Sequence, residues 1–102
     1  MTIAAPTDRI YLDGAAGRII EVLDNAESRK ITISNANLPD CTLWNPWVAG
    51  ARDFGDMPDD DYEKFVCVEN GQTGQIAIAA GGSWQSSVTI TSVGVEPGTA
   101  RL

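Results

Sequence analysis

The amino-acid sequence predicts an all-β fold, and two observations carry that prediction. Short segments of alternating or β-branched residues recur along the chain, and Gly, Asn, Asp and Pro residues separate them. The chain has 102 residues, 43% of them hydrophobic, which suffices for one compact core but not for two. We therefore expect a single β-sandwich domain over residues 1–93. A mobile tail is expected over residues 94–102, which have little apolar content.

Four short segments in the first half of the chain have the pattern of strands. They are residues 9–12, 17–23, 29–35 and 42–44. The second segment carries apolar side chains on both faces, so both faces are expected to be covered. The third alternates cleanly, with Ile31 and Ile33 inward, and is expected to form a hairpin with the second. Pro46 stops the fourth because proline offers no N–H to a neighbouring strand.

The second half of the chain resumes the strand pattern after an irregular excursion. At most one helical turn is expected there, over residues 48–54. Three further strands are expected at residues 65–69, 75–79 and 84–93. In the last of these, Trp84, Val88 and Ile90 share one face and polar residues, mostly hydroxyl-bearing, share the other, so one side should meet water or a partner.

The charge balance excludes several classes of partner. Seven Lys and Arg residues stand against fourteen Asp and Glu residues, a formal net charge of -7. The chain therefore has no basic surface for nucleic acid or an anionic membrane. No apolar run is long enough to span a bilayer, and the first residues lack the pattern of a secretory signal, so a cytoplasmic location is expected by default.

The residue types available for chemistry are also limited. The sequence contains no histidine, which excludes imidazole as an acid, a base or a metal ligand. Cys41 and Cys67 lie in strand-like runs without CxxC spacing, so they are expected to be reduced core residues. The acidic residues between 53 and 63 do not have the spacing of an EF-hand loop and are expected to be solvated. We therefore expect neither a metal nor a cofactor.

Three motifs follow one another in a specific order. They are Thr-Asp-Arg at residues 7–9 with Tyr11 close behind, Trp-Asn-Pro-Trp at residues 44–47, and Val-Cys-Val-Glu at residues 66–69. In this order they resemble the C-terminal part of the hexose-6-phosphate mutarotases, also called glucose-6-phosphate 1-epimerases. The resemblance spans about residues 7–92 and implies a partial galactose-mutarotase-like antiparallel β-sandwich. Such enzymes are about three times as long, so the chain resembles their last third standing alone.

The resemblance also implies a chemistry. Interconverting sugar anomers needs a base that takes the C1 hydroxyl proton and an acid that protonates the ring oxygen. The family's base matches Glu69, whose apolar neighbours on the same strand face should disfavour its charged form. Asp8 matches a family position that hydrogen-bonds sugar hydroxyls. The family's acid is a histidine, and this histidine and the phosphate-binding arginines precede the matched region.

Each candidate residue also has an ordinary structural interpretation. Glu69 could be a strand-end carboxylate beside the Asn70-Gly71 turn, and Asp8 could be a turn or surface residue. Trp44 and Trp47 could form an aromatic platform for a sugar ring, or they could be buried aromatics that close one end of the sandwich.

The prediction for function is therefore a stand-alone, catalytically incomplete mutarotase-like domain that retains weak carbohydrate binding. The alternatives are a structural protein that keeps only the fold as a homo-oligomer, and one half of a two-chain hexose-6-phosphate mutarotase. An isolated third of a sandwich exposes sheet edges, so a homodimer or higher oligomer is expected. The sequence does not specify which sugar is bound.

Overall fold

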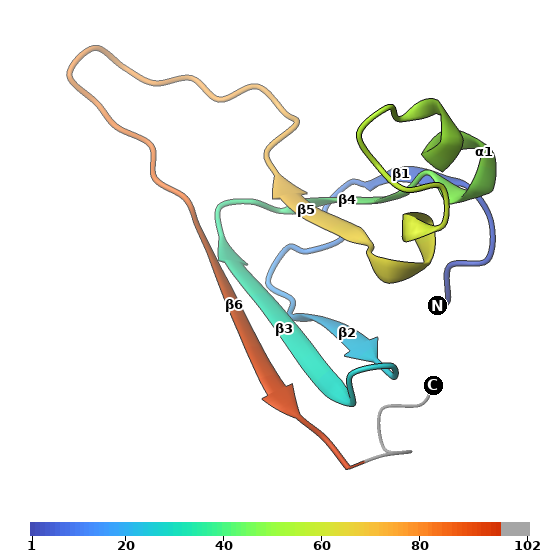
Figure 1. Ribbon diagram of the computed structural model, residues 1–102. Helices are drawn as coiled ribbons and strands as arrows, with labels where there is room; N and C mark the ends of the chain where they lie inside the picture. The colour runs from blue at the N-terminus through green and yellow to red at the C-terminus, as the bar shows by residue number, and fades with distance from the viewer. Residues whose placement is uncertain (97–102) are drawn as a thin grey trace.

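The computed structural model describes residues 1–96 and confirms the all-β class (Figure 1). Six strands form two three-stranded antiparallel sheets, with the strand orders β1-β4-β5 and β2-β3-β6. The strands are β1 Thr7–Tyr11, β2 Ile20–Asp24, β3 Arg29–Ala36, β4 Asp40–Asn45, β5 Cys67–Gly71 and β6 Ser87–Gly94. A helix, α1 (Trp47–Asp53), and a 3-10 turn, η1 (Asp61–Lys64), lie between β4 and β5. Neither of these, in the part of the chain that is described, has the length and apolar character needed to cross a membrane.

β2 and β3 form the hairpin that the sequence predicts. Ile20 lies opposite Ile33 and Val22 lies opposite Ile31, so the two strands share one apolar face. Ile33 is buried and Ile31 is half-buried, which confirms their inward direction. A slip of β2 by one residue against β3 would turn Ile20 and Val22 to the opposite face from Ile31 and Ile33, so this alternation fixes the register.

The segment before β3 differs from the prediction at its start. β2 begins at Ile20, because Gly17 has a φ of 63° and belongs to the turn that follows β1. Ile19 is 64% exposed, so the prediction that both faces of this segment are covered is wrong. β2 is an edge strand of its sheet, and only one of its faces is turned toward the other sheet.

The strand predicted at residues 75–79 is absent. These residues belong to the long excursion between β5 and β6, which extends away from both sheets in Figure 1. A strand needs neighbours for its backbone hydrogen bonds, and no described strand lies beside this segment. For the same reason the last strand begins at Ser87 and not at residue 84, because Ser87 is the first residue with a partner on β3.

The remaining expected elements are present with shifted ends. α1 lies where at most one helical turn is expected, over residues 48–54, and its seven residues make about two turns. η1 has no predicted counterpart, because so short a turn leaves no periodic pattern. β5 begins at Cys67, which pairs with Trp44. β6 ends at Gly94, and the Val95 N–H donates to the Ser28 carbonyl at 2.8 Å. Residues 97–102 lie outside the described part, so a mobile tail after a single domain remains a prediction.

The chain crosses between the two sheets three times, and the three crossings meet at Asp40. One Asp40 carboxylate oxygen accepts the Asp13 N–H, from the β1–β2 link, at 2.9 Å. The other accepts the Thr73 N–H at 2.8 Å and the Thr73 hydroxyl at 2.6 Å, just after β5. Asp40 itself begins β4, directly after the β3–β4 link, and it is buried. The Thr73 hydroxyl, followed by the backbone donors, holds the pKa of Asp40 below its usual value of 3.8.

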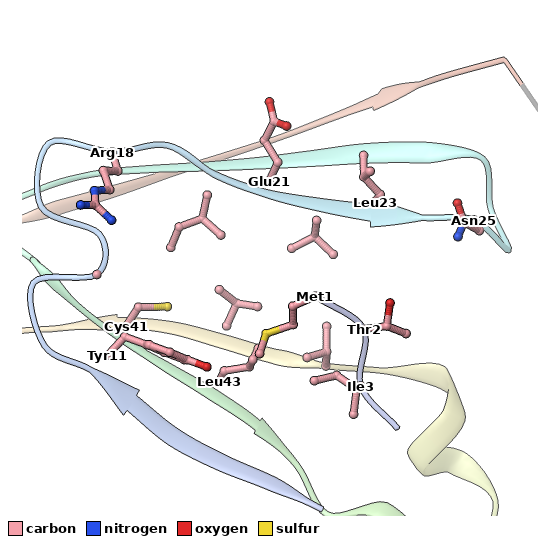
Figure 2. A pocket seen from close by; sticks show the side chains of 15 residues that line it. Met1, Thr2, Ile3, Tyr11, Arg18, Glu21, Leu23, Asn25, Cys41 and Leu43 are labelled. Carbon is pink, nitrogen blue, oxygen red and sulfur yellow. The ribbon is translucent and has the colours of Figure 1, made fainter. Parts of the chain in front are cut away.

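An apolar cleft of about 540 Å³ separates the two sheets (Figure 2). Apolar side chains from both sheets line it: Tyr11, Cys41, Leu43 and Val68 from the first, and Ile20 and Val22 from the second. Met1 and Ile3 of the N-terminal segment lie beside Leu43 in this cleft. Few hydrophobic residues of the described chain are fully buried, namely Ala15, Ile33, Cys41 and Ala51. The two sheets therefore face each other without closing into the compact core that the composition would allow.

The Asp40 junction predicts a pH-dependent stability. Because the folded pKa of Asp40 lies below the unfolded value, its stabilising effect is complete above about pH 4 and is lost as the pH falls through the folded pKa. Asp40→Asn should lower the urea midpoint at pH 7, and the difference from the wild type should shrink as the pH approaches 3. Urea unfolding followed by circular dichroism between pH 3 and 7 measures both effects. Asp59→Asn, at an exposed position, is the control and should retain the wild-type midpoint; an Asp40→Asn midpoint equal to the wild type at pH 7 would contradict the role of the junction.

Candidate functional site

Asn45 organises the Trp-Asn-Pro-Trp motif at the end of β4. It is 2% exposed, and its side-chain N–H groups donate to the Tyr62 carbonyl at 2.9 Å and the Phe65 carbonyl at 2.8 Å. Its Oδ1 accepts the Trp47 N–H at 2.9 Å. A buried amide is stable only when such partners are present. Asn45 therefore joins the end of β4 to α1 and to the segment that leads into β5.

Trp47 has a backbone conformation that is unusual for its residue type. Its φ is 59°, in the left-handed region that bulky side chains rarely adopt. The hydrogen bond from its N–H to Asn45 helps to hold this conformation. Its ring packs against Tyr62 of η1, with ring centroids 4.9 Å apart. The motif thus places the Trp47 ring in contact with η1.

Trp44 lies in a separate aromatic cluster. Its ring meets the edge of Phe54 at a centroid distance of 6.0 Å and a tilted Phe65 at 5.9 Å. Both tryptophans are half-buried. Each indole therefore has a packing role at this end of the first sheet, and part of its surface stays accessible.

The register of the first sheet brings three of the candidate residues to one face. Asp8 on β1 pairs with Trp44 on β4, and Glu69 on β5 pairs with Thr42 two residues away on the same strand. Directly opposed residues, and residues two apart, share a face of a sheet. The alternate residues, including Leu43, line the cleft between the sheets. Asp8, Trp44 and Glu69 therefore lie on the outer face of the sheet, away from that cleft.

A shallow hollow of about 430 Å³ lies at one end of this outer face. Asp8, Trp44 and Asp53 contribute to its wall, together with Pro46 and Gly50. A Cβ atom on Gly50 would come within 2.9 Å of the ring of Pro46, the residue that caps the start of α1, so glycine leaves room for the proline ring on this side of the helix. The hollow combines two carboxylates with an aromatic surface, and no basic residue lines it.

Glu69 lies outside the hollow. It is separated from Asp8 by two strand spacings and two residues along the strand, or about 12 Å between Cα atoms at standard sheet dimensions. Glu69 is exposed, so the apolar neighbours predicted on its face do not bury it. Asp8 is exposed as well. The two carboxylates could therefore contact opposite sides of one bound molecule, but not the same atom.

The two cysteines are free, as the sequence predicts. Cys41 is buried and Cys67 is half-buried. Burial raises the pKa of both thiols, and the negative charge of Glu69 raises that of Cys67 further, whereas at Cys41 a hydrogen bond with the Glu69 backbone partly offsets the effect of burial. Both sulfurs therefore stay protonated at neutral pH and are poor nucleophiles.

One of the cations near the motifs is held in an ion pair. Lys64 forms an ion pair with Asp61 at 3.0 Å, and this contact raises the pKa of the lysine. Among residues 1–96, the other ion pairs are Arg29 with Asp24 at 2.8 Å and Lys30 with Glu21 at 3.7 Å, both in the β2–β3 hairpin. In the same residues, no group of three or more Asp, Glu or Cys side chains is arranged to hold a metal ion.

The family model for aldose 1-epimerase matches residues 2–91, nearly the whole chain. The chain belongs to the aldose 1-epimerase family. No solved structure matches it significantly.

Curated relatives carry the name "Putative glucose-6-phosphate 1-epimerase". One from Cenchrus ciliaris is 29% identical over 87 residues, which cover 84% of this chain and 26% of the relative. One from Escherichia coli K12 is 41% identical over 63 residues, which cover 62% of this chain and 21% of the relative. The chain thus spans about a quarter of the length of these relatives.

The sequence does not single out two residues of this region: Asn45, which organises it, and Thr42, which lies at its centre. Asn45 is part of the motif that carries the resemblance, but an Asn before a Pro indicates only the end of a strand. In the structure it is buried, and its side chain joins β4 to the segment before β5. Thr42 lies between Ile10 and Glu69 on the outer face. A threonine in a strand carries no signal in a single sequence, because only strand pairing places it beside Glu69.

Removing the Asn45 amide should destabilise the protein strongly. Asn45→Ala leaves two carbonyls and one N–H without their partner in a buried place, and such a loss costs about 3 kcal/mol of unfolding free energy. The melting temperature should fall by at least about 10 °C. Differential scanning calorimetry measures this, and Asn25→Ala, at an exposed position, should stay within about 0.5 kcal/mol of the wild type. An Asn45→Ala variant as stable as Asn25→Ala would show that the amide is not essential.

Proposed function

We propose that the outer face of the first sheet is the part of a sugar-1-epimerase site that holds the general base, and that this chain alone lacks the parts needed for turnover. The base is Glu69, and Asp8 and Trp44 contact the sugar. The observation that best supports this proposal is that all three residues share one face of the β1-β4-β5 sheet. Family membership supports the reaction class.

The proposed reaction opens and recloses a hexose ring. Glu69 accepts the proton of the C1 hydroxyl while an acid protonates the ring oxygen, and the aldehyde rotates before the ring closes again. A carboxylate about 12 Å from Asp8 leaves room for a sugar ring between them. Asp8 accepts hydrogen bonds from sugar hydroxyls, and the indole of Trp44 offers an apolar surface to a ring face.

The proton donor is the missing part. The chain has no histidine, and Tyr62 and Lys64 are the nearest donors in the sequence. Burial and a hydrogen bond to Glu63 raise the pKa of Tyr62, and Asp61 raises the pKa of Lys64. A general acid works best with a pKa near the operating pH, so both changes make these groups poorer donors. Turnover therefore requires an acid from another polypeptide segment.

An activity assay tests this proposal. Exchange between the anomers of glucose 6-phosphate, followed by NMR, should be no faster with this chain than in buffer, because proton transfer by a positioned acid is worth about 100-fold to 10,000-fold. Glu69→Gln and the control Glu27→Gln, in the β2–β3 turn, should both equal the wild type. Acceleration that disappears in Glu69→Gln but persists in Glu27→Gln would overturn the claim of incompleteness and identify Glu69 as a working base.

Sugar binding should be weak and indifferent to phosphate. The hollow carries two carboxylates and no cation, so a phosphate ester gains nothing over the neutral sugar. Titrating glucose and glucose 6-phosphate against tryptophan fluorescence should give dissociation constants of about millimolar order for both. Asp8→Asn should weaken both. Micromolar binding of the phosphate ester that is lost in Arg52→Ala or Lys64→Ala would contradict this and reveal a phosphate site.

One further observation supports an interaction role as the second candidate function. Ile76, Ile78, Val88, Ile90 and Val93 are each more than a third exposed, and all of them lie in the last third of the described chain. Isolated exposed hydrophobics are ordinary, whereas several on one excursion and its following strand are typical of a contact surface. The two candidates use different sheets and are compatible.

A further inference from the structure

The charges of this chain are distributed unevenly. Glu69 is followed by no Asp, Glu, Lys or Arg until Glu96. Every residue from 73 to 94 is nevertheless exposed. A soluble surface is designed with about 25–35% charged residues, whereas the centres of natural protein interfaces are depleted of charge. This segment therefore has the exposure of a surface and the composition of an interface.

β6 is the part of this segment that offers an ordered surface. It is an edge strand of its sheet and pairs only with β3 among the described strands. Its eight residues contain no charge and no proline, and the register with β3 runs without a bulge from Ser87 to Gly94. Charges, prolines and bulges are the features by which natural proteins usually protect an edge strand, and β6 has none of them. The opposite edge of the same sheet, β2, carries Glu21 and Asp24.

The molecule also exposes more surface than a compact protein of its size. Its accessible surface is 7200 Å², whereas a folded monomer of 10.9 kDa is expected to expose about 5,600 Å². Its radius of gyration is 16.3 Å, against about 13 Å for a compact domain of this length. The excess, roughly 1,600 Å², belongs to the whole chain, and residues 73–94, all of them exposed, contribute to it. Each partner of a standard interface contributes about 800 Å².

We propose that β6 pairs antiparallel with β6 of a second copy, around a twofold axis at Ile90. The sequence Thr-Ile-Thr is symmetric about Ile90, so Ile90 meets its own copy and Thr89 meets Thr91. This register keeps the face of Ile33 and Ile90 continuous across the dimer and pairs hydroxyls on the other face. The two three-stranded sheets become one six-stranded sheet. The net charge of -7 on each copy opposes association only at longer range, where salt screens it, since the edge itself carries no charge.

A charge placed on either edge of the sheet tests which edge is used. Light scattering after gel filtration should give about 22 kDa for the wild type, twice the mass of the chain. Ile90→Lys should give a monomer, because an edge lysine blocks pairing. Ile19→Lys, next to β2, is the matched control, since Ile19 and Ile90 are 64% and 65% exposed, and it should remain a dimer. Circular dichroism should show unchanged β content in both variants, because neither side chain is buried.

A cysteine scan tests the register independently. Ile90→Cys should form a disulfide-linked dimer on mild oxidation, because directly opposed residues have Cα atoms about 5 Å apart. Val93→Cys should not, since in this register the two copies of residue 93 are separated by six residues, or about 20 Å. The wild type, with its two free cysteines, controls for background cross-linking.

The opposite outcomes overturn the proposal. A wild-type chain that stays near 11 kDa at micromolar concentration would show that β6 does not pair with a second copy. A dimer lost in Ile19→Lys but kept in Ile90→Lys would assign the contact to β2. Cross-linking of Val93→Cys without cross-linking of Ile90→Cys would exclude the twofold axis at Ile90.

Discussion

The Asp40 carboxylate is the point on which the relation between the two sheets depends. The strand order sends the chain from one sheet to the other three times, and each crossing contributes a group to this junction. Three donors to one buried carboxylate satisfy it and fix its direction, so the links cannot move independently. Few hydrophobic residues of the described chain are buried, so this polar junction helps to hold the two sheets together. In bigger sandwiches a larger apolar core does this.

The candidate site depends on a second buried polar group at the other end of β4. Asn45 fixes where β4 ends and where β5 begins, and thereby determines that Trp44, Thr42 and Glu69 come to one outer face. The site is open because Asp8 and Glu69 lie on exposed sheet positions, and among the described residues no basic side chain lines the hollow beside Asp8. Such a face can bind a neutral, hydroxyl-rich molecule weakly. Proton transfer requires a better enclosed site, where the surroundings shift the pKa values of the base and the acid toward the working pH.

The two sheets divide the properties of the chain between them. The first carries the acidic, polar face and the aromatic motif, whereas the second ends in an uncharged edge beyond which the described chain offers no partner. Each sheet has only three strands, and a three-stranded sheet cannot cover its own edges or faces. Of the surfaces left exposed, the outer face of the first sheet carries carboxylates and the edge at β6 carries no charge.

The sequence by itself determined the all-β class, the β2–β3 hairpin, the reduced cysteines and the family, because these follow from alternation over neighbouring residues and from ordered motifs. It predicted a strand at residues 75–79 that is absent, and it placed the start of the last strand at residue 84 instead of Ser87. A β pattern becomes a strand only where a neighbouring strand supplies hydrogen bonds. The tertiary structure decided the register that brings Asp8 to the face of Glu69, the burial of Asn45 and Asp40, and the exposure of Glu69. These properties depend on contacts between residues far apart in the chain, for which a single sequence contains no local signal.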